Sequence, residues 1–173
     1  WMGSPSTVKY LDLISEPLRR IADSNPTVRW EIMGGSDFSM EGVPWELHDW
    51  SLETELAALA RYDIGLMPLP LEDWAKGKSG GKARTYMAAG VVPVVTGVGY
   101  NLELIDDGQT GFICRDMADW EAIIQNLLDD VKMREQVGLA ARADVVSRFA
   151  PAGQAGKLVE LFHRVLSQSK FKR

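Results

Sequence analysis

The chain has very few of the residues that form disulfides and metal sites: one cysteine, Cys114, and two histidines in 173 residues. One thiol cannot form an internal disulfide and favours a reducing compartment, so we expect a cytoplasmic protein. A structural zinc site is excluded, because the chain has no Cys/His cluster. Long apolar runs are also lacking, since none approaches the roughly 20 residues that span a bilayer. The sequence therefore predicts a soluble protein with no structural metal.

An excess of positive charge is absent as well, because 19 basic side chains stand against 24 acidic ones and the formal net charge is −5. Affinity for a nucleic-acid backbone comes from clustered lysine and arginine, so the composition argues against a dedicated nucleic-acid binder. The chain also contains no internal repeat or low-complexity segment. Its length predicts one domain over residues 1–173, large enough to bury about 70% of the surface of the unfolded chain.

Short apolar segments alternate with helical patterns through most of the chain. The opening Trp1-Met2-Gly3 is typical of a buried strand that ends in a turn, so we expect a truncated chain whose upstream part is missing; the alternative is a short tag remnant before a real start. Apolar residues then recur every three or four positions and predict a helix: Val8, Leu11, Ile14, Leu18 and Ile21. Further strands are predicted at 28–33, 45–48, 64–67, 91–96 and 112–114, and further helices at 52–60, 82–89, 116–130, 131–149 and 151–167.

This alternation predicts an α/β fold with a doubly wound, Rossmann-like parallel sheet and a helical carboxyl-terminal tail. Pro93, inside one predicted strand, indicates an irregular or edge-like backbone there. Ligands bind such sheets outside the carboxyl ends of the strands. Four predicted turns at that edge contain glycine, which lets backbone N–H groups approach an anion, although turns also use glycine for their own geometry. These turns are Gly3 with Ser4, Gly34 with Gly35, residues 77–81, and Gly97 with Gly99.

The stretch from Lys76 to Leu102 holds four basic residues and no acidic one. Lys78 and Lys82 are four positions apart, so a helix that begins near Lys78 would carry both amines on one face at its positive end. Cations at that end oppose the helix dipole, and stability alone does not favour them. Two such charges beside open N–H groups suit a diphosphate, and the alternative is a solvated basic loop.

Two segments resemble nucleotide-binding motifs, but each lacks a residue that its motif requires. Residues 97–102, GVGYNL, have leucine where the dinucleotide fingerprint needs its third glycine, which argues against NAD. Residues 77–82, GKSGGK, lack the serine or threonine that follows the lysine of a Walker A loop. The sequence therefore gives no support to a nicotinamide-dependent enzyme or a nucleoside-triphosphate hydrolase.

Three kinds of side chain near this edge have both a binding and a structural interpretation. His48 ends a predicted strand beside Trp50, where a nucleotide base could lie. Trp50 and Trp74 could stack on a base or sugar, although tryptophans more often pack. Glu103 begins a short helix after the glycine turn, and it could accept hydrogen bonds from sugar hydroxyls or simply cap the helix.

The order of these segments resembles the family-1 retaining glycosyltransferases of GT-B fold. Residues 77–113, GKSGGKARTYMAAGVVPVVTGVGYNLELIDDGQTGFI, resemble the family's signature region. MGSPSTVKYL, EIMGG and DIGLMPLP resemble its first donor-side turn and helix, its second strand and turn, and the strand before the signature, and DWEAIIQNLLDDVKMREQVGLAAR resembles its helical tail. The resemblance implies the carboxyl-terminal, donor-binding half of such an enzyme, with the amino-terminal acceptor-binding domain absent from this chain.

The resemblance also implies a nucleotide-diphosphate sugar as donor substrate, with no metal and no other cofactor. Lys78 and Lys82 become the catalytic contacts to the diphosphate, with Ser4 and Thr7 beside it and Glu103 near the phosphate or sugar. The other predicted binding residues are Gly3, Gly34, Gly35, His48, Trp50, Gly99, Tyr100 and Asn101. The implied reaction is glycosyl transfer with retention to an unknown acceptor, without nucleic acid, and with any peripheral membrane association made through the absent domain.

This chain departs from the family pattern at two positions. The family commonly carries two glutamates eight residues apart, whereas the matching positions here are Gly77 and Thr85, which have no carboxylate. A subgroup that opens with W-x-x-G-K fits Trp74 to Lys78 better, and sugar recognition then falls to other groups. A catalytically idle nucleotide-binding or regulatory module and a nucleotide-sugar epimerase therefore stay open as alternatives. We also expect exposed apolar surface where the absent domain would pack.

Overall fold

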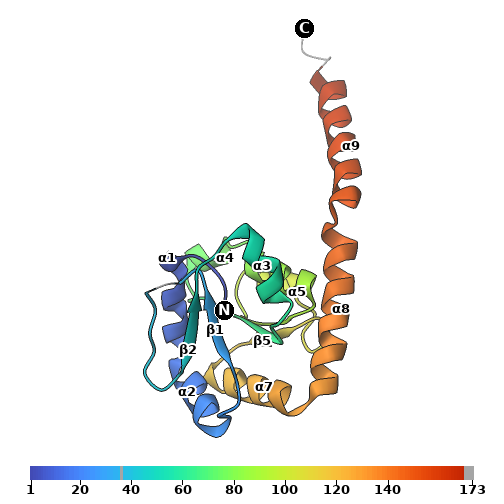
Figure 1. Cartoon of the computed structure of the whole chain (residues 1–173). Coiled ribbons are helices and arrows are strands. Elements are labelled where there is room, and N and C mark those ends of the chain that lie inside the picture. The colour runs from blue at the N-terminus through green and yellow to red at the C-terminus, as the bar shows by residue number, and fades with distance from the viewer. Residues whose placement is uncertain (36, 170–173) are drawn as a thin grey trace.

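The computed structural model describes residues 1–35 and 37–169, and its strands form two parallel sheets (Figure 1). One sheet pairs β1 with β2, and the other has the order β3-β4-β5. The strands are β1 (Trp30–Met33), β2 (Trp45–His48), β3 (Ile64–Met67), β4 (Val92–Thr96) and β5 (Phe112–Cys114). The predicted α/β fold with parallel strands is confirmed.

Helices cover both faces of the strands, with α2 and α7 on one side and α3 and α5 on the other (Figure 1). The helices are α1 (Pro5–Val8), the 3₁₀ segment η1 (Lys9–Ile14), α2 (Ser15–Ser24), α3 (Leu52–Leu59), α4 (Asp73–Lys76), α5 (Gly81–Ala89), α6 (Asn101–Leu104), α7 (Met117–Asp129), α8 (Val131–Phe149) and α9 (Pro151–Ser169). Alternating residues of β4 serve the two faces: Val94 packs in the cluster with α2 and α7, and Val95 in the cluster with α5. The apolar residues that predicted the first helix are all buried.

Pro93 does not mark an edge, because β4 is the central strand of its sheet. The N–H of Val92 donates to the carbonyl of Asp63 next to β3, at 3.0 Å, so the next backbone position faces β5. Pairing with β5 begins only at Val94, opposite Phe112. The missing N–H of proline therefore leaves no partner unsatisfied, and the prediction of an edge-like strand was wrong for this reason.

The first three residues extend the smaller sheet. The N–H of Met33 donates to the carbonyl of Trp1 at 2.9 Å, and the N–H of Gly3 donates to the carbonyl of Met33 at 3.0 Å. Toward the larger sheet, the buried hydroxyl of Tyr86 accepts from the N–H of Met2 at 3.0 Å and donates to the carbonyl of Leu66 at 3.2 Å. Among the residues that the structure describes, no backbone hydrogen bond joins the two sheets. We call this boundary the seam.

The carboxyl-terminal helix α9 follows α8 and projects away from the rest of the chain (Figure 1). Its apolar side chains are between 49% and 55% exposed at Leu158, Val159, Leu161, Phe162 and Val165. The chain therefore exposes apolar surface along α9, and the expectation that an absent domain would pack on such surface stays a prediction. No helix within 1–35 and 37–169 has both the length and the apolar character needed to cross a membrane.

Candidate functional site

The predicted glycine turns at the carboxyl ends of the strands do come together. Gly34 follows β1 with φ +83°, and its N–H donates to the carbonyl of His48 at 2.8 Å. A Cβ at Gly34 would lie 2.2 Å from the carbonyl oxygen of Gly3, so only glycine lets these two turns approach so closely. Gly35 is buried, and a Cβ there would lie 2.8 Å from Val8, so this residue packs inward on α1.

Lys82 lies directly beside the first of these turns, although 75 residues separate it from Thr7 along the chain. Its Nζ donates to the Thr7 hydroxyl at 3.3 Å and lies 5.1 Å from the centre of the Trp1 ring. The Ser4 hydroxyl is 3.3 Å from that of Thr7. A Cβ at Gly3 would lie 2.5 Å from Cε of Lys82. The structure therefore brings together four of the predicted residues: Gly3, Ser4, Thr7 and Lys82.

The surroundings of Lys82 disfavour the charged form of its amine. Burial lowers the pKa of Lys82, and the positive charge of Lys78 lowers it further. No carboxylate among the described residues forms an ion pair with Lys82. Lys82 is also the second residue of α5, where the first N–H groups of a helix have no partner within the helix. An anion placed here would meet both the ammonium and these N–H groups.

Lys78 does not share a helix face with Lys82, and that expectation was wrong. Helix α5 begins at Gly81, because Gly80 before it adopts a left-handed conformation with φ +67° and stops the helix from extending toward Lys78. Lys78 instead lies in the loop after α4, with Nζ 3.6 Å from the centre of the Trp74 ring. Trp74 in turn packs against Tyr10, at 5.7 Å between ring centres. The two lysines still lie near the same edge, since the charge of Lys78 acts on Lys82.

A groove of about 840 Å³ opens beside Lys78. The 76–79 loop, the 97–100 turn and four further side chains line it: Leu71, Arg84, Leu102 and Glu103. The predicted residues Gly99, Tyr100 and Glu103 therefore share one wall, and the exposed carboxylate of Glu103 is available to a ligand. Asn101 is only 1% exposed, and its side-chain amide donates to the carbonyl of Thr96 at 3.0 Å, which gives it a structural contact.

Arg84 is a wall residue that the sequence reasoning did not select as a site residue. It belongs to the acid-free basic stretch, two positions after Lys82, and this was the available signal. Lys82 itself turns toward Thr7 and is not part of the groove lining.

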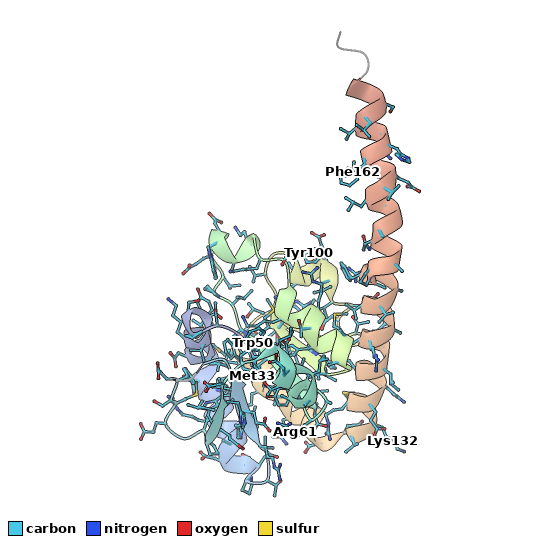
Figure 2. All side chains as sticks on the ribbon, turned by 45° about the horizontal axis from the view of Figure 1, so that its top comes forward. Met33, Trp50, Arg61, Tyr100, Lys132 and Phe162 are labelled. Carbon is cyan, nitrogen blue, oxygen red and sulfur yellow. The ribbon has the colours of Figure 1, made fainter. Side chains whose placement is uncertain are left out.

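His48 and Trp50 do not line this groove. The imidazole Nε2 of His48 is 3.4 Å from Glu31 and 3.6 Å from Glu46, so the side chain faces carboxylates of β1 and β2 and not the lysines. These three side chains each bring a donor atom within 4.8 Å of the others and could hold a metal ion, although Arg61 already pairs with Glu31 at 3.4 Å. Trp50 is 52% exposed (Figure 2), and its indole N–H donates to the carboxylate of Glu55 at 2.8 Å.

Residues 1–130 match the family model for Glycosyl transferases group 1, which covers more than half of the chain. No curated protein sequence matches the chain. Among solved structures, TarM of S. aureus has a TM-score of 0.72 at 16% identity over 94% of this chain. HepE of Anabaena in complex with UDP-glucose has a TM-score of 0.72 at 14% identity, also over 94%. The C-terminal domain of the group 1 glycosyl transferase LpcC from Francisella tularensis has a TM-score of 0.62 at 16% identity over 86%.

The share of each solved structure that this chain covers differs from one structure to the next. The chain spans 34% of TarM and 47% of HepE, but 82% of the isolated C-terminal domain of LpcC. At 14–16% identity the similarity to these structures shows the fold alone. The match to the family model is a separate finding. The chain thus belongs to the group 1 glycosyl transferases, and its fold is that of the carboxyl-terminal half of a GT-B enzyme, as the sequence resemblance predicted.

Proposed function

We propose that this chain is the donor-binding domain of a retaining glycosyltransferase and that it binds a nucleotide-diphosphate sugar at the Gly3–Lys82 edge. The observation that carries the proposal is the Lys82 ammonium, which is partly buried against Thr7 without a carboxylate partner in the described residues. The family match supports it. So do the UDP bound to TarM and the UDP-glucose bound to HepE, two proteins of similar fold.

In this proposal the diphosphate lies between the Ser4–Thr7 turn and the start of α5. The hydroxyls of Ser4 and Thr7 and the Lys82 ammonium donate to its oxygens, and the first N–H groups of α5 face it. Lys78 adds a second positive charge, so two ammonium groups do the work that a divalent metal would otherwise do. In this proposal the exposed ring of Trp50 stacks on the base, and Glu103 in the groove accepts hydrogen bonds from sugar hydroxyls.

Catalysis follows from where charge builds up. When the bond between the anomeric carbon and the diphosphate breaks, negative charge grows on the leaving phosphate, and a fixed ammonium stabilises it without reorganisation. Removal of one preorganised donor of this kind typically raises the barrier by about 3 kcal/mol. In the complete enzyme we therefore expect Lys82→Ala to lower turnover by roughly 10² to 10³-fold while the fold persists. If the variant had the kinetics of the wild type, the role of Lys82 in stabilising the leaving phosphate would be refuted.

The acceptor site belongs, in this proposal, to a second domain outside the chain. The chain spans less than half of TarM and HepE, and the apolar side chains of α9 are exposed. A glycosyl group can transfer only when an acceptor is held against the anomeric carbon. We therefore expect the isolated chain to bind donor and to transfer nothing.

The direct test is calorimetric titration of the chain with UDP, GDP and ADP. We expect one of them to bind at a single site and Lys82→Ala to weaken binding by roughly 10 to 100-fold. Lys132→Ala is the matched control, because Lys132 is exposed at the start of α8 (Figure 2) and should bind as the wild type does. Failure of all three nucleotides to bind would refute the proposal.

A catalytically idle nucleotide-binding module is the second candidate, favoured by the absence of a carboxylate at Gly77 and Thr85. Both candidates bind nucleotide, so binding does not separate them. Product analysis of the complete protein with donor and acceptor does, because only the transferase forms a new glycosidic bond. The same analysis identifies an epimerase, which would release nucleotide and an altered sugar.

A further inference from the structure

The groove beside Lys78 has an unbalanced set of charges. Its lining includes three cationic side chains, Lys76, Lys78 and Arg84, and one carboxylate, Glu103. Lys76 pairs with Asp73 at 2.7 Å. Over residues 1–35 and 37–169, no carboxylate lies within ion-pair distance of Lys78 or Arg84. Two cations therefore face this groove without a partner of opposite charge.

Both cations are held in position by contacts that leave most of their donors free. The guanidinium of Arg84 lies 5.3 Å from the centre of the Phe149 ring, and one of its nitrogens donates to the Ser79 hydroxyl at 3.4 Å. Lys78 is held over the Trp74 ring at 3.6 Å. Aromatic contacts fix a cation without using its N–H groups. Arginine has five N–H donors, so most of them remain for a ligand.

Lys82 and Arg84 carry positive charges that face different parts of the site. Lys82 turns to Thr7 and does not line the groove, whereas Arg84, on the same helix, does. The 76–79 loop that lines the groove leads to the start of α5, so a sugar attached to a diphosphate at that helix start would extend into the groove. A neutral sugar offers hydroxyls, and these leave Arg84 without an anionic partner among the described residues. A carboxylate supplies one, and the planar guanidinium matches its two oxygens.

We infer that the donor sugar carries a carboxylate, as a nucleotide-linked hexuronic acid does, and that Arg84 selects it in the groove while Lys78 serves the diphosphate. The inference rests on the proposed function, because the diphosphate position defines where the sugar lies. Glu103, which also lines the groove, accepts from the sugar hydroxyls.

The test compares two ligands that differ only at C6, UDP-glucuronic acid and UDP-glucose, by calorimetry on the chain. If the chain prefers guanosine, GDP-mannuronic acid and GDP-mannose replace them. We expect the acidic sugar to bind about tenfold more tightly, as a charge-assisted pair predicts. Arg84→Gln should bring the ratio of the two affinities to about one while the affinity for the free nucleoside diphosphate stays within about twofold. Arg142→Gln, which changes an exposed arginine of α8, should leave the ratio unchanged.

The outcomes separate this inference from the proposed function. Equal affinities, or a preference for the neutral sugar, in a chain that binds the nucleoside diphosphate would overturn the inference and leave the proposed function standing. Equal losses for every ligand in Arg84→Gln would also overturn it, because Arg84 would then serve the diphosphate. Failure of every nucleotide to bind would overturn both.

Discussion

Replacement of Lys82 by methionine should have opposite effects on stability and on binding. Methionine keeps the length of the side chain and removes the charge. Burial and Lys78 lower the pKa of Lys82 from its ordinary value of 10.5, so the folded state binds this proton less readily than the unfolded state. The free energy of unfolding of the wild type therefore rises with pH between the lowered pKa and 10.5, and at neutral pH the charged lysine destabilises the fold. The ligand-free variant should be at least as stable as the wild type.

The same change should weaken binding of the nucleoside diphosphate. A hydrogen bond to a charged group contributes about 1.5–3 kcal/mol, which corresponds to roughly 10 to 150-fold in dissociation constant. Scanning calorimetry gives the unfolding midpoint, titration calorimetry gives the affinity, and Lys132→Met supplies a control on an exposed lysine. An unchanged affinity, or a clearly lower midpoint without ligand, would refute the reasoning that this charge is retained for binding at a cost to stability.

Three other predictions test the packing. Gly138→Ala should destabilise the fold by about 1–3 kcal/mol in denaturant unfolding, because the new Cβ would lie 2.2 Å from the backbone oxygen of Gly90. Gly153→Ala, where a Cβ meets nothing within 4 Å, should not, and equal losses in both would contradict the packing argument. Cys114 is 1% exposed, and burial raises the pKa of its thiol. Iodoacetamide at pH 8 should therefore label Cys114 only as the chain unfolds. Rapid labelling without denaturant would show that the thiol is accessible in the folded chain. A chain that ends at Ala150 should keep its unfolding midpoint within about 2 °C by circular dichroism, since the side chains of α9 are exposed; a much larger fall would mean that α9 stabilises the body.

The sequence predicted the elements well because each has a strong local signal. Residues such as Leu11 and Ile14 repeat at helical spacing, and the short apolar strands are closed by proline or glycine. Helical spacing also explains the main error at the site. An i, i+4 spacing places Lys78 and Lys82 on one face only if both lie in one helix, and the start of that helix is decided by the backbone of Gly80.

The contacts between distant segments were harder to predict. The approach of Lys82 to Thr7 came from the general rule that ligands bind at the carboxyl edge, together with the family resemblance. Strand alternation alone puts His48 and Glu46 on one face of β2, but no local pattern could place His48 beside Glu31, because that contact depends on the register of β1 with β2. Arg84 was missed because only the packed structure shows which side chains line the groove.

The proposed diphosphate site lies across the seam between the two sheets. Met2 and Gly3 belong to the smaller sheet and lead into Thr7, whereas Lys82 lies in the first turn of α5, between β3 and β4 in the chain. A diphosphate that joins Thr7 to Lys82 would therefore add a further polar link across the seam, beside the phenol of Tyr86. It would act together with the apolar cluster that already spans both sheets through Ile32, Leu66 and Val94, so an occupied edge would oppose separation of the two sheets.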